Sequence, residues 1–539
     1  MARYVFVVGG VMSGIGKGVS TASIGAILKS YGFGVTAVKI DPYLNVDAGT
    51  MNPIEHGEVF VTEDGLECDQ DIGNYERFLD QNMYRFNYMT AGQVYQSVIE
   101  KERALHYGGK CVEVVPHITE EVIGRIKAAG DKTKADFVLI EIGGTVGEYQ
   151  NSIFLEAGRI MRLSMPGKVI FIMVSYLPVP KMIGEMKTKP TQHAVRSLNT
   201  AGIQPDIIIA RSSVPIDQPR KQKIATFCNV EDADVISAPD IQSIYEIPVN
   251  FEKDKLGERI LGKFGIPRKK SKLESWTKFN KKLRKFRKEI KVAIAGKYFS
   301  TGRFMLSDAY ISVIEAIKHA AFLVRVRPGI HWIDAEIYEH YPARIKELSK
   351  FSGIIVPGGF GERGVEGKLK IIKFARARRI PYLGLCYGMQ LAAVEFARNV
   401  CGLKNAHTTE INKDALHKII SVLPEQETNI KSMQYGGTMR LGSYPCELRE
   451  NSIAQKAYGE KRVIERHRHR YEFNNEFREQ FEKAGLVISG INPQKNLVEV
   501  IELKKHPFFI GTQFHPELKS RPFSPHPLFS AFIKAASKK

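Results

Sequence analysis

The sequence contains few cysteines and no long hydrophobic run. Its 539 residues include six cysteines, which lie far apart and form no C-x-x-C pair. This spacing argues against a disulfide framework or a cysteine zinc site, and it fits a reducing compartment. No apolar stretch approaches the roughly 18 residues that a membrane-spanning helix needs. The apolar run after Arg3 is too short for a signal peptide and leads into a glycine-rich loop, so we expect a cytoplasmic protein.

Charge is unevenly distributed along the chain. The formal net charge is +20, and much of the excess lies between residues 268 and 288. We interpret this segment as a solvated linker and helix face, because no recognition-helix, zinc-finger or RNA-binding strand pattern accompanies it. We therefore expect no specific nucleic-acid partner. A basic enzyme that binds triphosphates also needs cationic pockets.

The length and the hydrophobic pattern predict two large α/β domains. In the N-terminal half, short β-branched runs alternate with amphipathic stretches, which is typical of a parallel sheet covered on both faces. The expected strands are 4–8, 35–40, 111–115, 137–142, 169–174, 207–210 and 235–237. The expected helices include 19–31, 120–129, 153–163 and 191–201. A second alternation begins at Lys291. We expect two doubly wound, mostly parallel sheets: one in domain 1–265, one in domain 291–539, joined by a basic linker at 266–290 that could include a short helix.

A glycine-rich loop follows the first predicted strand. Residues 9–18 read GGVMSGIGKG and lead into a predicted helix. Glycines let successive backbone N–H groups point at phosphate oxygens, the helix N-terminus adds positive potential, and Lys17 reaches the distal phosphates. The alternative is a glycine-rich turn with an incidental lysine. The order of strand, loop and helix favours nucleotide binding.

The lysine of this loop is not followed by the usual hydroxyl residue. Gly18 stands where a Walker A loop has Ser or Thr, so Mg²⁺ must find hard oxygen ligands elsewhere. Glu141 lies near the carboxyl end of a predicted strand, where ligands of open α/β sheets bind. Asp71 lies in an acidic loop and is equally well explained as a solvated acid. The segment 187–192, KTKPTQ, suits a triphosphate but also suits an ordinary capped loop.

The C-terminal half carries a cysteine in a sharp turn between a predicted strand and a predicted helix. Cys386 is flanked by Gly384 and Gly388, the pattern of a nucleophile elbow, and a helix N-terminus favours the thiolate. His515 is placed to accept the thiol proton, and Glu517 to hold the imidazole, since in an extended H-x-E both side chains leave the same face. The loop 357–361, PGGFG, can supply backbone N–H groups to an oxyanion. The alternatives are a structural cysteine and a surface His-Glu pair; together the three features predict amide hydrolysis through a thioester.

With both sites in view, the chain resembles the CTP synthase family over essentially its whole length, and its C-terminal half looks like a class I (triad-type) glutamine amidotransferase. The matching runs are 10–18, 39–47, 56–61, 141–147, 187–192 and 465–472. The resemblance implies a ligase of pyrimidine biosynthesis: ATP phosphorylates O4 of UTP, and ammonia from glutamine, passed through an internal channel, displaces the phosphate to give CTP. It also implies an ATP-using, Mg²⁺-dependent homotetramer (a dimer of dimers), inhibited by CTP and activated by GTP.

The resemblance also assigns roles to individual positions. ATP would contact Gly14, Ile15, Gly16, Lys17, Gly18, Val19, Lys39 and Asp71, and Mg²⁺ would be held by Asp71 and Glu141. UTP or CTP, at a subunit interface, would contact Ser13, Glu148, Tyr149, Gln150, Lys187, Thr188, Lys189, Pro190, Thr191, Gln192 and Lys223. Glutamine would be held against Cys386 by Gly359, Tyr387, Gly388, Met389, Gln390, Glu410 and Arg470.

The sequence departs from the family pattern in three places. Tyr387 stands where the family often has Leu, and residues 148–150, EYQ, replace a loop that often carries two acids. The segment 429–435 matches the GTP-lid pattern poorly.

Two alternatives remain open. One is another amidotransferase of similar layout, resembling the cobyric or cobyrinic acid amidating enzymes, whose phosphate loop is related; runs 39–47 and 187–192 favour the UTP enzyme. The other is a scaffold or filament protein, or a basic nucleic-acid binder, with vestigial sites.

Overall fold

The chain divides into two compact units, which are described separately. The computed structural model describes residues 2–182, 184–267, 270–283, 286–296, 300–301, 304–305, 308–422 and 437–539. Unit 1 comprises Met1–Asp47 and Asn74–Lys282, and unit 2 comprises Ala48–Gly73 and Leu283–Lys539. Among the described residues, no helix has the length and apolar character needed to cross a membrane. Segment 429–435 lies outside the described residues.

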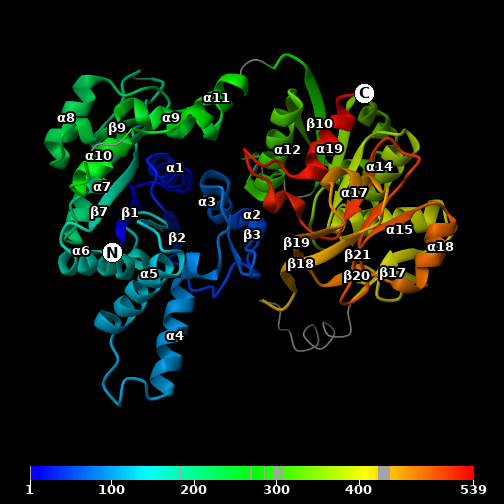
Figure 1. The fold of residues 1–539 in the computed structure, drawn as a ribbon, viewed down its shortest axis with the longest axis horizontal. Helices are drawn as coiled ribbons and strands as arrows, with labels where there is room; N and C mark the ends of the chain where they lie inside the picture. Colours follow the sequence, from blue (N-terminus) through cyan, green and yellow to red (C-terminus); the bar gives the residue numbers. More distant parts are fainter. Residues whose placement is uncertain are drawn as a thin grey trace. The chain divides into compact units, whose positions relative to one another are not determined.

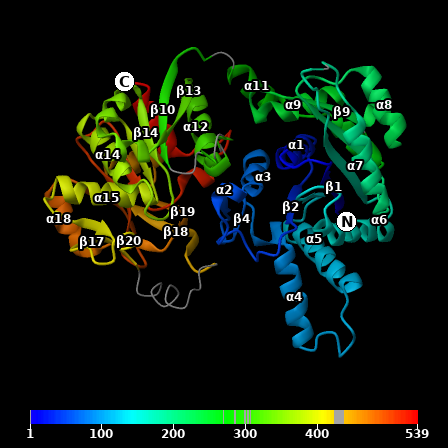
Figure 2. The same cartoon turned by 180° about the vertical axis from the view of Figure 1, so that it is seen from behind.

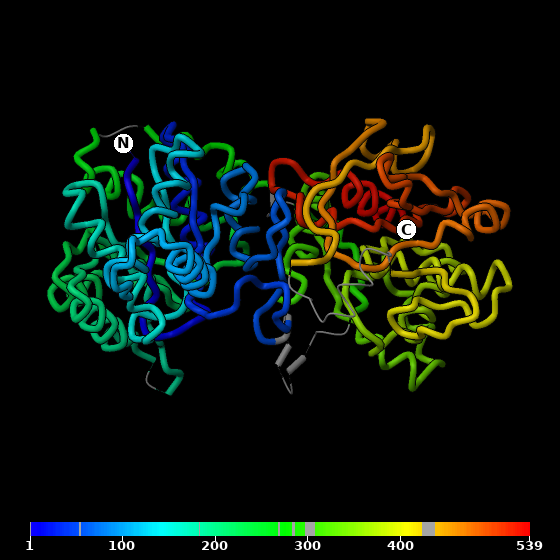
Figure 3. Tube along the Cα trace, turned by 90° about the horizontal axis from the view of Figure 1, so that it is seen from below, coloured from blue at the N-terminus to red at the C-terminus, as the bar shows by residue number. Residues whose placement is uncertain are grey.

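Unit 1 is built on a seven-stranded sheet in which all neighbouring pairs are parallel. The strands, in spatial order, are β5 (Tyr88–Thr90), β2 (Val35–Asp41), β6 (Phe137–Ile142), β1 (Arg3–Gly9), β7 (Val169–Tyr176), β8 (Ile207–Ser212) and β9 (Val235–Pro239). The first strand therefore lies in the middle, and the dark blue trace in Figure 3 runs among segments from later in the unit. The nearly continuous apolar sequences of these strands follow from burial on both faces.

Helices cover both faces of this sheet, as a doubly wound fold requires. Phe6 and Val8 of β1 belong to one core cluster with residues of α5 (Thr119–Thr133) and α6 (Ser152–Ser164). These two helices lie side by side in both views (Figures 1 and 2). The helix α1 (Lys17–Ser30) packs against β1, β2 and β6 from outside that cluster. Parallel strands need such crossovers, which bring all their carboxyl ends to one edge.

One expected strand is wrong. Residues 111–115 do not join the sheet; they lead into an irregular helical turn, Val114–Ile118, and the Val114 and Val115 side chains are 47% and 46% exposed. The edge position beside β2 is taken by the short strand β5, which the sequence pattern did not reveal. A β-branched run becomes a strand only where a neighbouring strand and a packing face are available.

Part of the basic segment 266–290 is a helix, α11 (Glu274–Leu283). Its Trp276 and Phe279 side chains are buried in unit 1, where Trp276 stacks on Phe78 at 5.3 Å and Phe279 meets Tyr245 edge-on at 5.7 Å. Lysines 278, 281 and 282 of the same helix are exposed. The charge here thus lies on the solvated face of an amphipathic helix.

Unit 2 is built on a nine-stranded mixed sheet. In spatial order the strands are β13 (Arg327–Asp334), β10 (Glu289–Gly296), β14 (Gly353–Val356), β15 (Tyr382–Leu385), β23 (Phe509–Thr512), β22 (Leu497–Glu502), β21 (Val487–Asn492), β18 (Arg440–Leu448) and β19 (Arg462–His469). The pairs from β13 to β23 are parallel, and the pairs from β23 to β19 are antiparallel. Two core clusters lie on its two faces: α14 (Val365–Ala377) and α15 (Tyr387–Asn399) contribute to one, α12 (Ile311–Val324) and α19 (Pro527–Ala536) to the other. The α/β class predicted from the sequence is confirmed.

A hairpin from the N-terminal half of the sequence packs within unit 2. The strands β3 (Val59–Val61) and β4 (Glu67–Asp69) form an antiparallel pair. Arg466 and Arg468 of β19 bond to Glu63 and Glu67, each at 2.8 Å. These pairs, each with one fully buried partner, fasten the segment 48–73 to the C-terminal sheet. The domain bounds 1–265 and 291–539 stay a prediction, because packing alone groups this segment differently.

Candidate active sites

The glycine-rich loop of unit 1 wraps around the Lys17 side chain. Gly14 and Gly16 adopt left-handed φ angles of 69° and 81°, which glycine adopts without strain. Gly16 directly precedes α1, and Lys17, its first residue, donates from Nζ to the Gly144 carbonyl oxygen at 2.6 Å. A Cβ atom at Gly9 would lie 2.7 Å from that same oxygen, so only glycine fits there. The loop therefore presents a helix N-terminus and an ammonium group together, as phosphate binding requires.

Two predicted residues meet at the carboxyl edge of the unit 1 sheet. Glu141 on β6 and Lys39 on the neighbouring strand β2 stand at the same register, and their side chains pair at 3.1 Å. Glu141 is 1% exposed and also accepts a hydrogen bond from the Tyr75 hydroxyl. Asp71 begins α3 (Asp71–Leu79), where its backbone N–H donates to Asp69, and belongs to unit 2 by packing. The two predicted metal ligands thus lie in different units.

The residues predicted to contact a uridine nucleotide lie on the segments that follow strands β1, β6 and β7, which include short helical stretches, and on α8 (Gln218–Cys228). Ser13 is exposed in the phosphate loop, and Glu148 accepts from the Thr145 N–H at 2.9 Å. The Tyr149 side chain is 96% exposed. Gln150 and Lys223 are exposed as well.

The segment Lys187–Gln192 surrounds the start of α7 (Lys189–Thr200). Lys187 is held by Glu185 at 2.7 Å, and Lys189 lies over the Phe227 ring. Pro190 stands in the first turn, where its missing N–H costs nothing. Buried side chains support this turn: Thr191 bonds to Ser175 at 2.8 Å, and Gln192 donates to Thr188 at 3.1 Å.

Sequence reasoning missed a pocket beside the phosphate loop. It is lined by Gly16, Val19, Ser20, Arg211, Ala238, Pro239, Asp240, Ile241, Ile244, Ile247, Asn250 and Phe251. Arg211 donates to the Ile15 carbonyl oxygen at 3.3 Å and pairs with Asp240 at 3.0 Å. The pocket combines apolar walls with a few fixed polar groups, as small-molecule sites do. No local motif marks the whole pocket, because its walls combine the phosphate loop and α1 with Arg211 of β8 and with the segments from β9 onward.

Cys386 of unit 2 occupies a strained turn between β15 and α15. Its φ of 49° and ψ of −100° are unusual for a residue with a side chain, and its backbone N–H donates to the Thr512 carbonyl oxygen at 2.6 Å. A Cβ atom at Gly388 would lie 2.1 Å from the Val356 oxygen, so the turn needs glycine there. The elbow predicted from the sequence is present in the fold, with the thiol at a helix N-terminus.

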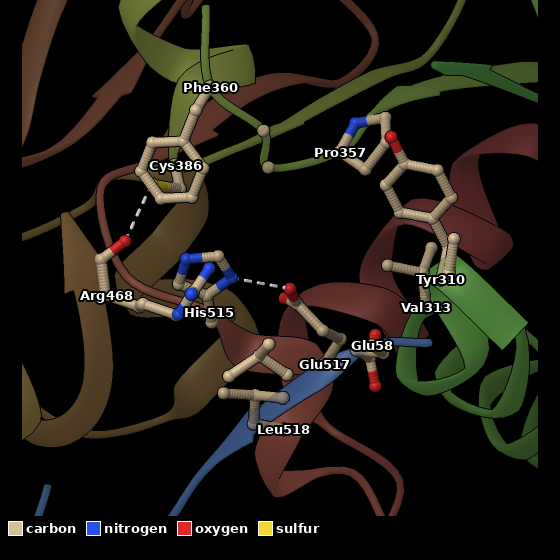
Figure 4. A pocket seen from close by; sticks show the side chains of 14 residues that line it. Glu58, Tyr310, Val313, Pro357, Phe360, Cys386, Arg468, His515, Glu517 and Leu518 are labelled. Atoms are coloured by element: carbon tan, nitrogen blue, oxygen red, sulfur yellow. Dashed lines mark hydrogen bonds and ion pairs between the residues drawn. The ribbon is translucent and has the colours of Figure 1, made fainter. Parts of the chain in front are cut away.

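His515 connects Cys386 with an acid. Its Nδ1 lies 2.7 Å from Glu517 Oε1, and Figure 4 shows the carboxylate turned toward the ring. Glu517 belongs to the helical turn Pro516–Lys519, so the contact arises from a turn and not from an extended strand. Burial alone would lower the pKa of His515, but the negative charges of Glu517 and Cys386 outweigh it and raise that pKa to about 10. The arrangement therefore favours the protonated form of the His515 imidazole.

The glycine loop adjoins this pair. A Cβ atom at Gly358 would lie 2.8 Å from His515 Cε1 and 3.8 Å from Cys386 Cβ. A pocket runs along the triad, lined by Glu58, Val59, Ala309, Tyr310, Val313, Pro357, Gly358, Gly359, Phe360, Cys386, Arg468, His515, Glu517 and Leu518 (Figure 4). Sequence reasoning gave no role to Glu58, which accepts from the Ser312 N–H at the start of α12.

Gly359 is the one predicted glutamine contact that lines this pocket within the described chain. Tyr387 donates from its hydroxyl to the Gly361 oxygen at 3.0 Å, and the Gly361 N–H donates to Glu410 at 2.6 Å. These two bonds fasten the glycine loop from both sides. Arg470 donates to Thr438 at 2.8 Å.

Two further predicted glutamine contacts, Met389 and Gln390, are buried in α15. Gln390 donates to the Tyr471 oxygen at 2.9 Å and to Gln513 Oε1 at 3.2 Å. Gly388 precedes these two residues, and its backbone packs closely against the Val356 carbonyl oxygen.

The comparisons with known proteins cover both halves of the chain. Residues 3–266 match the family model described as CTP synthase N-terminus, and residues 305–535 match glutamine amidotransferase class-I. A protein named CTP synthase from Caldanaerobacter subterraneus subsp. tengcongensis is 49% identical over 537 residues, which cover 99% of this chain and 98% of that protein. The chain belongs to the CTP synthase family. A second family member, from Sulfolobus acidocaldarius, is also 49% identical and matches over 100% of both chains. A solved glutaminase domain of a Trypanosoma brucei CTP synthase with bound acivicin is 36% identical, covers 46% of this chain and 94% of its own, and has a TM-score of 0.43.

Proposed function

We propose that this member of the CTP synthase family converts UTP to CTP with ATP and with ammonia released from glutamine. One observation carries the proposal: a single chain holds a phosphate loop in unit 1 and a Cys386–His515–Glu517 triad in unit 2. ATP would phosphorylate O4 of UTP, and ammonia would displace that phosphate. We also place the protein in the cytoplasm.

Glutamine hydrolysis would follow from the triad geometry. His515 takes the thiol proton, Cys386 Sγ attacks the amide carbon, and backbone N–H groups of the loop containing Gly359 stabilise the oxyanion. As the C–N bond breaks, the His515 imidazolium gives its proton to the departing ammonia. Water then cleaves the thioester and releases glutamate. The bond from Glu517 supports this proposal because it keeps the imidazole oriented through both proton transfers.

ATP would bind with its phosphates on the loop 14–19 and its base in the pocket lined by Ile241 and Arg211. Lys17 and Lys39 would then neutralise phosphate charge. The chemistry of Glu141 suits a magnesium ion, since it is a buried carboxylate at the carboxyl edge of the unit 1 sheet. The role of Asp71 as a second oxygen ligand stays a prediction. When bound, Mg²⁺ neutralises charge on the transferring phosphoryl group.

The uridine nucleotide would bind to the loops containing Ser13, residues 148–150 and residues 187–192, with Lys223 nearby. The 96% exposure of Tyr149 supports a site completed by another subunit, and we propose a homotetramer. CTP would compete at this site as a feedback inhibitor, and GTP would activate glutamine hydrolysis.

Incubation with UTP, ATP, Mg²⁺ and glutamine tests the proposal, with CTP followed by its absorbance. We expect CTP in proportion to the glutamate released. Absence of product with UTP would favour an amidotransferase for another acceptor, such as the cobyrinic acid type. Absence of both synthesis and glutamine hydrolysis would favour a scaffold with vestigial sites.

A further inference from the structure

The side chain of Gln513 contacts the sulfur of the nucleophile, Cys386. Gln513 follows β23, its side chain is completely buried, and its Nε2 lies 3.7 Å from Cys386 Sγ. This distance is within the range of a hydrogen bond to sulfur. Its backbone N–H donates to the Glu499 oxygen at 2.8 Å, which fixes the residue to β22.

A neighbouring amide determines which end of the Gln513 side chain faces the sulfur. Gln390 Nε2 donates both to the Tyr471 carbonyl oxygen and to Gln513 Oε1. Because a backbone carbonyl accepts only, Gln390 must present its NH₂ group on this side, and Gln513 must turn its oxygen toward it. The Gln513 NH₂ group is thereby directed at Cys386.

The Cys386 sulfur also contacts a hydrogen-bond acceptor, which lies on β19. The Arg468 carbonyl oxygen lies 3.7 Å from Sγ and can accept from the neutral thiol, whereas it repels a thiolate. An amide N–H is a better partner for the thiolate, because hydrogen bonds to an ionised acceptor are the stronger ones. The two contacts thus favour the two protonation states of the same sulfur.

We propose that Gln513 is a catalytic residue of the glutaminase reaction, donating from Nε2 to the Cys386 sulfur whenever that sulfur carries negative charge. This inference rests on the proposed glutamine hydrolysis. The thiolate forms twice, before attack on glutamine and when the thioester is cleaved. In both steps the donor stabilises charge on sulfur without supplying a proton.

The other polar groups near the Cys386 sulfur have interactions of their own. His515, with Glu517 behind it, is the proton acceptor. The guanidinium of Arg468 pairs with Glu67 and lies over the Phe360 ring. His469 is buried, and its pKa is lowered first by burial and also by nearby positive charge, including that of His515. Substitution of Gln513 by Met leaves all of these groups in place and removes only the amide.

The test is the pH dependence of iodoacetamide alkylation at Cys386, read by mass spectrometry of the peptide that contains it. In Gln513→Met the thiolate loses one hydrogen bond, so the pH midpoint of Cys386 alkylation should rise by about one pH unit. Gln513→Glu should move it further, because a carboxylate repels the thiolate. Gln390→Leu, which releases the Gln513 amide, should move it in the same direction by less.

Thr512→Val is the matched control. It removes a buried hydroxyl that bonds to the Phe514 oxygen in the same segment, without touching the sulfur, and should leave the midpoint unchanged. Ammonia-dependent CTP synthesis checks that each variant is folded. A midpoint of Gln513→Met equal to wild type, or one matched by Thr512→Val, would overturn the inference. Wild-type protein that alkylates at Cys386 yet releases no ammonia from glutamine would instead refute the proposed function.

Discussion

Replacing Glu517 by Gln removes one negative charge from the triad and leaves its shape intact. The 2.7 Å contact with His515 Nδ1 is buried, and Glu517 is one of two charges that raise the pKa of His515 to about 10. In the variant, the Nδ1 proton loses a charged acceptor. We expect the imidazolium to be less stable and the ring to be less firmly oriented.

The magnitude follows from the strength of that bond. A hydrogen bond to a charged group contributes about 1.5–3 kcal/mol, which corresponds to a downward shift of roughly one to two pH units in the titration of His515. The sign is downward because the carboxylate favours the protonated ring. The same energy lost from the transition state lowers kcat/KM for glutamine roughly 10- to 100-fold.

The assay compares glutamine hydrolysis with ammonia-dependent CTP synthesis across pH. The alkaline limb of glutamine hydrolysis, expected near pH 10 in the wild type, should move toward neutrality in Glu517→Gln. Ammonia-dependent synthesis should be unchanged, since it does not use the triad. A variant with wild-type kcat/KM and an unmoved alkaline limb would refute the reasoning.

Two further substitutions test the two sites. Lys17→Ala should abolish synthesis with either nitrogen source, because the phosphate loop loses its ammonium group, which donates to the Gly144 oxygen. Full turnover with ammonia would contradict the phosphate-loop assignment. Tyr387→Phe should lower kcat/KM for glutamine roughly fivefold, because one hydrogen bond that holds the Gly361 loop, about 1 kcal/mol, disappears; steady-state kinetics with both nitrogen sources would check this, and an equal fall with ammonia would show a general loss of structure instead.

Much of the fold and both chemical centres could be predicted from local patterns in the sequence. The turn around Cys386 and the loop around Lys17 depend on glycines a few residues away, so their geometry is encoded in a short segment. The contact of His515 with Glu517 also arises within three residues. The parallel sheet of unit 1 was predictable because strands buried on both faces have continuous apolar sequences.

Features that depend on distant pairings were not predictable. The position of Gln513 beside Cys386 follows from the register of β15 with β23, which places Leu385 opposite Thr512. The pocket lined by Arg211 and Ile241 joins the phosphate loop to distant segments that carry no motif of their own. The hairpin at 59–69 joins unit 2 through the hydrogen bond between Arg466 and Glu63, which are 403 residues apart in the sequence. The strand expected at 111–115 was wrong for a similar reason, since the place beside β2 is taken by β5 and residues 114–118 form an irregular helical turn.

The central claim is that two separate centres act in sequence, one releasing nitrogen and the other activating UTP to receive it. The most direct measurement is CTP synthesis by Cys386→Ala with glutamine and with ammonium chloride as alternative nitrogen sources. We expect no CTP from glutamine and wild-type rates from ammonia. Undiminished synthesis from glutamine, or equal loss with both sources in a folded variant, would contradict the account.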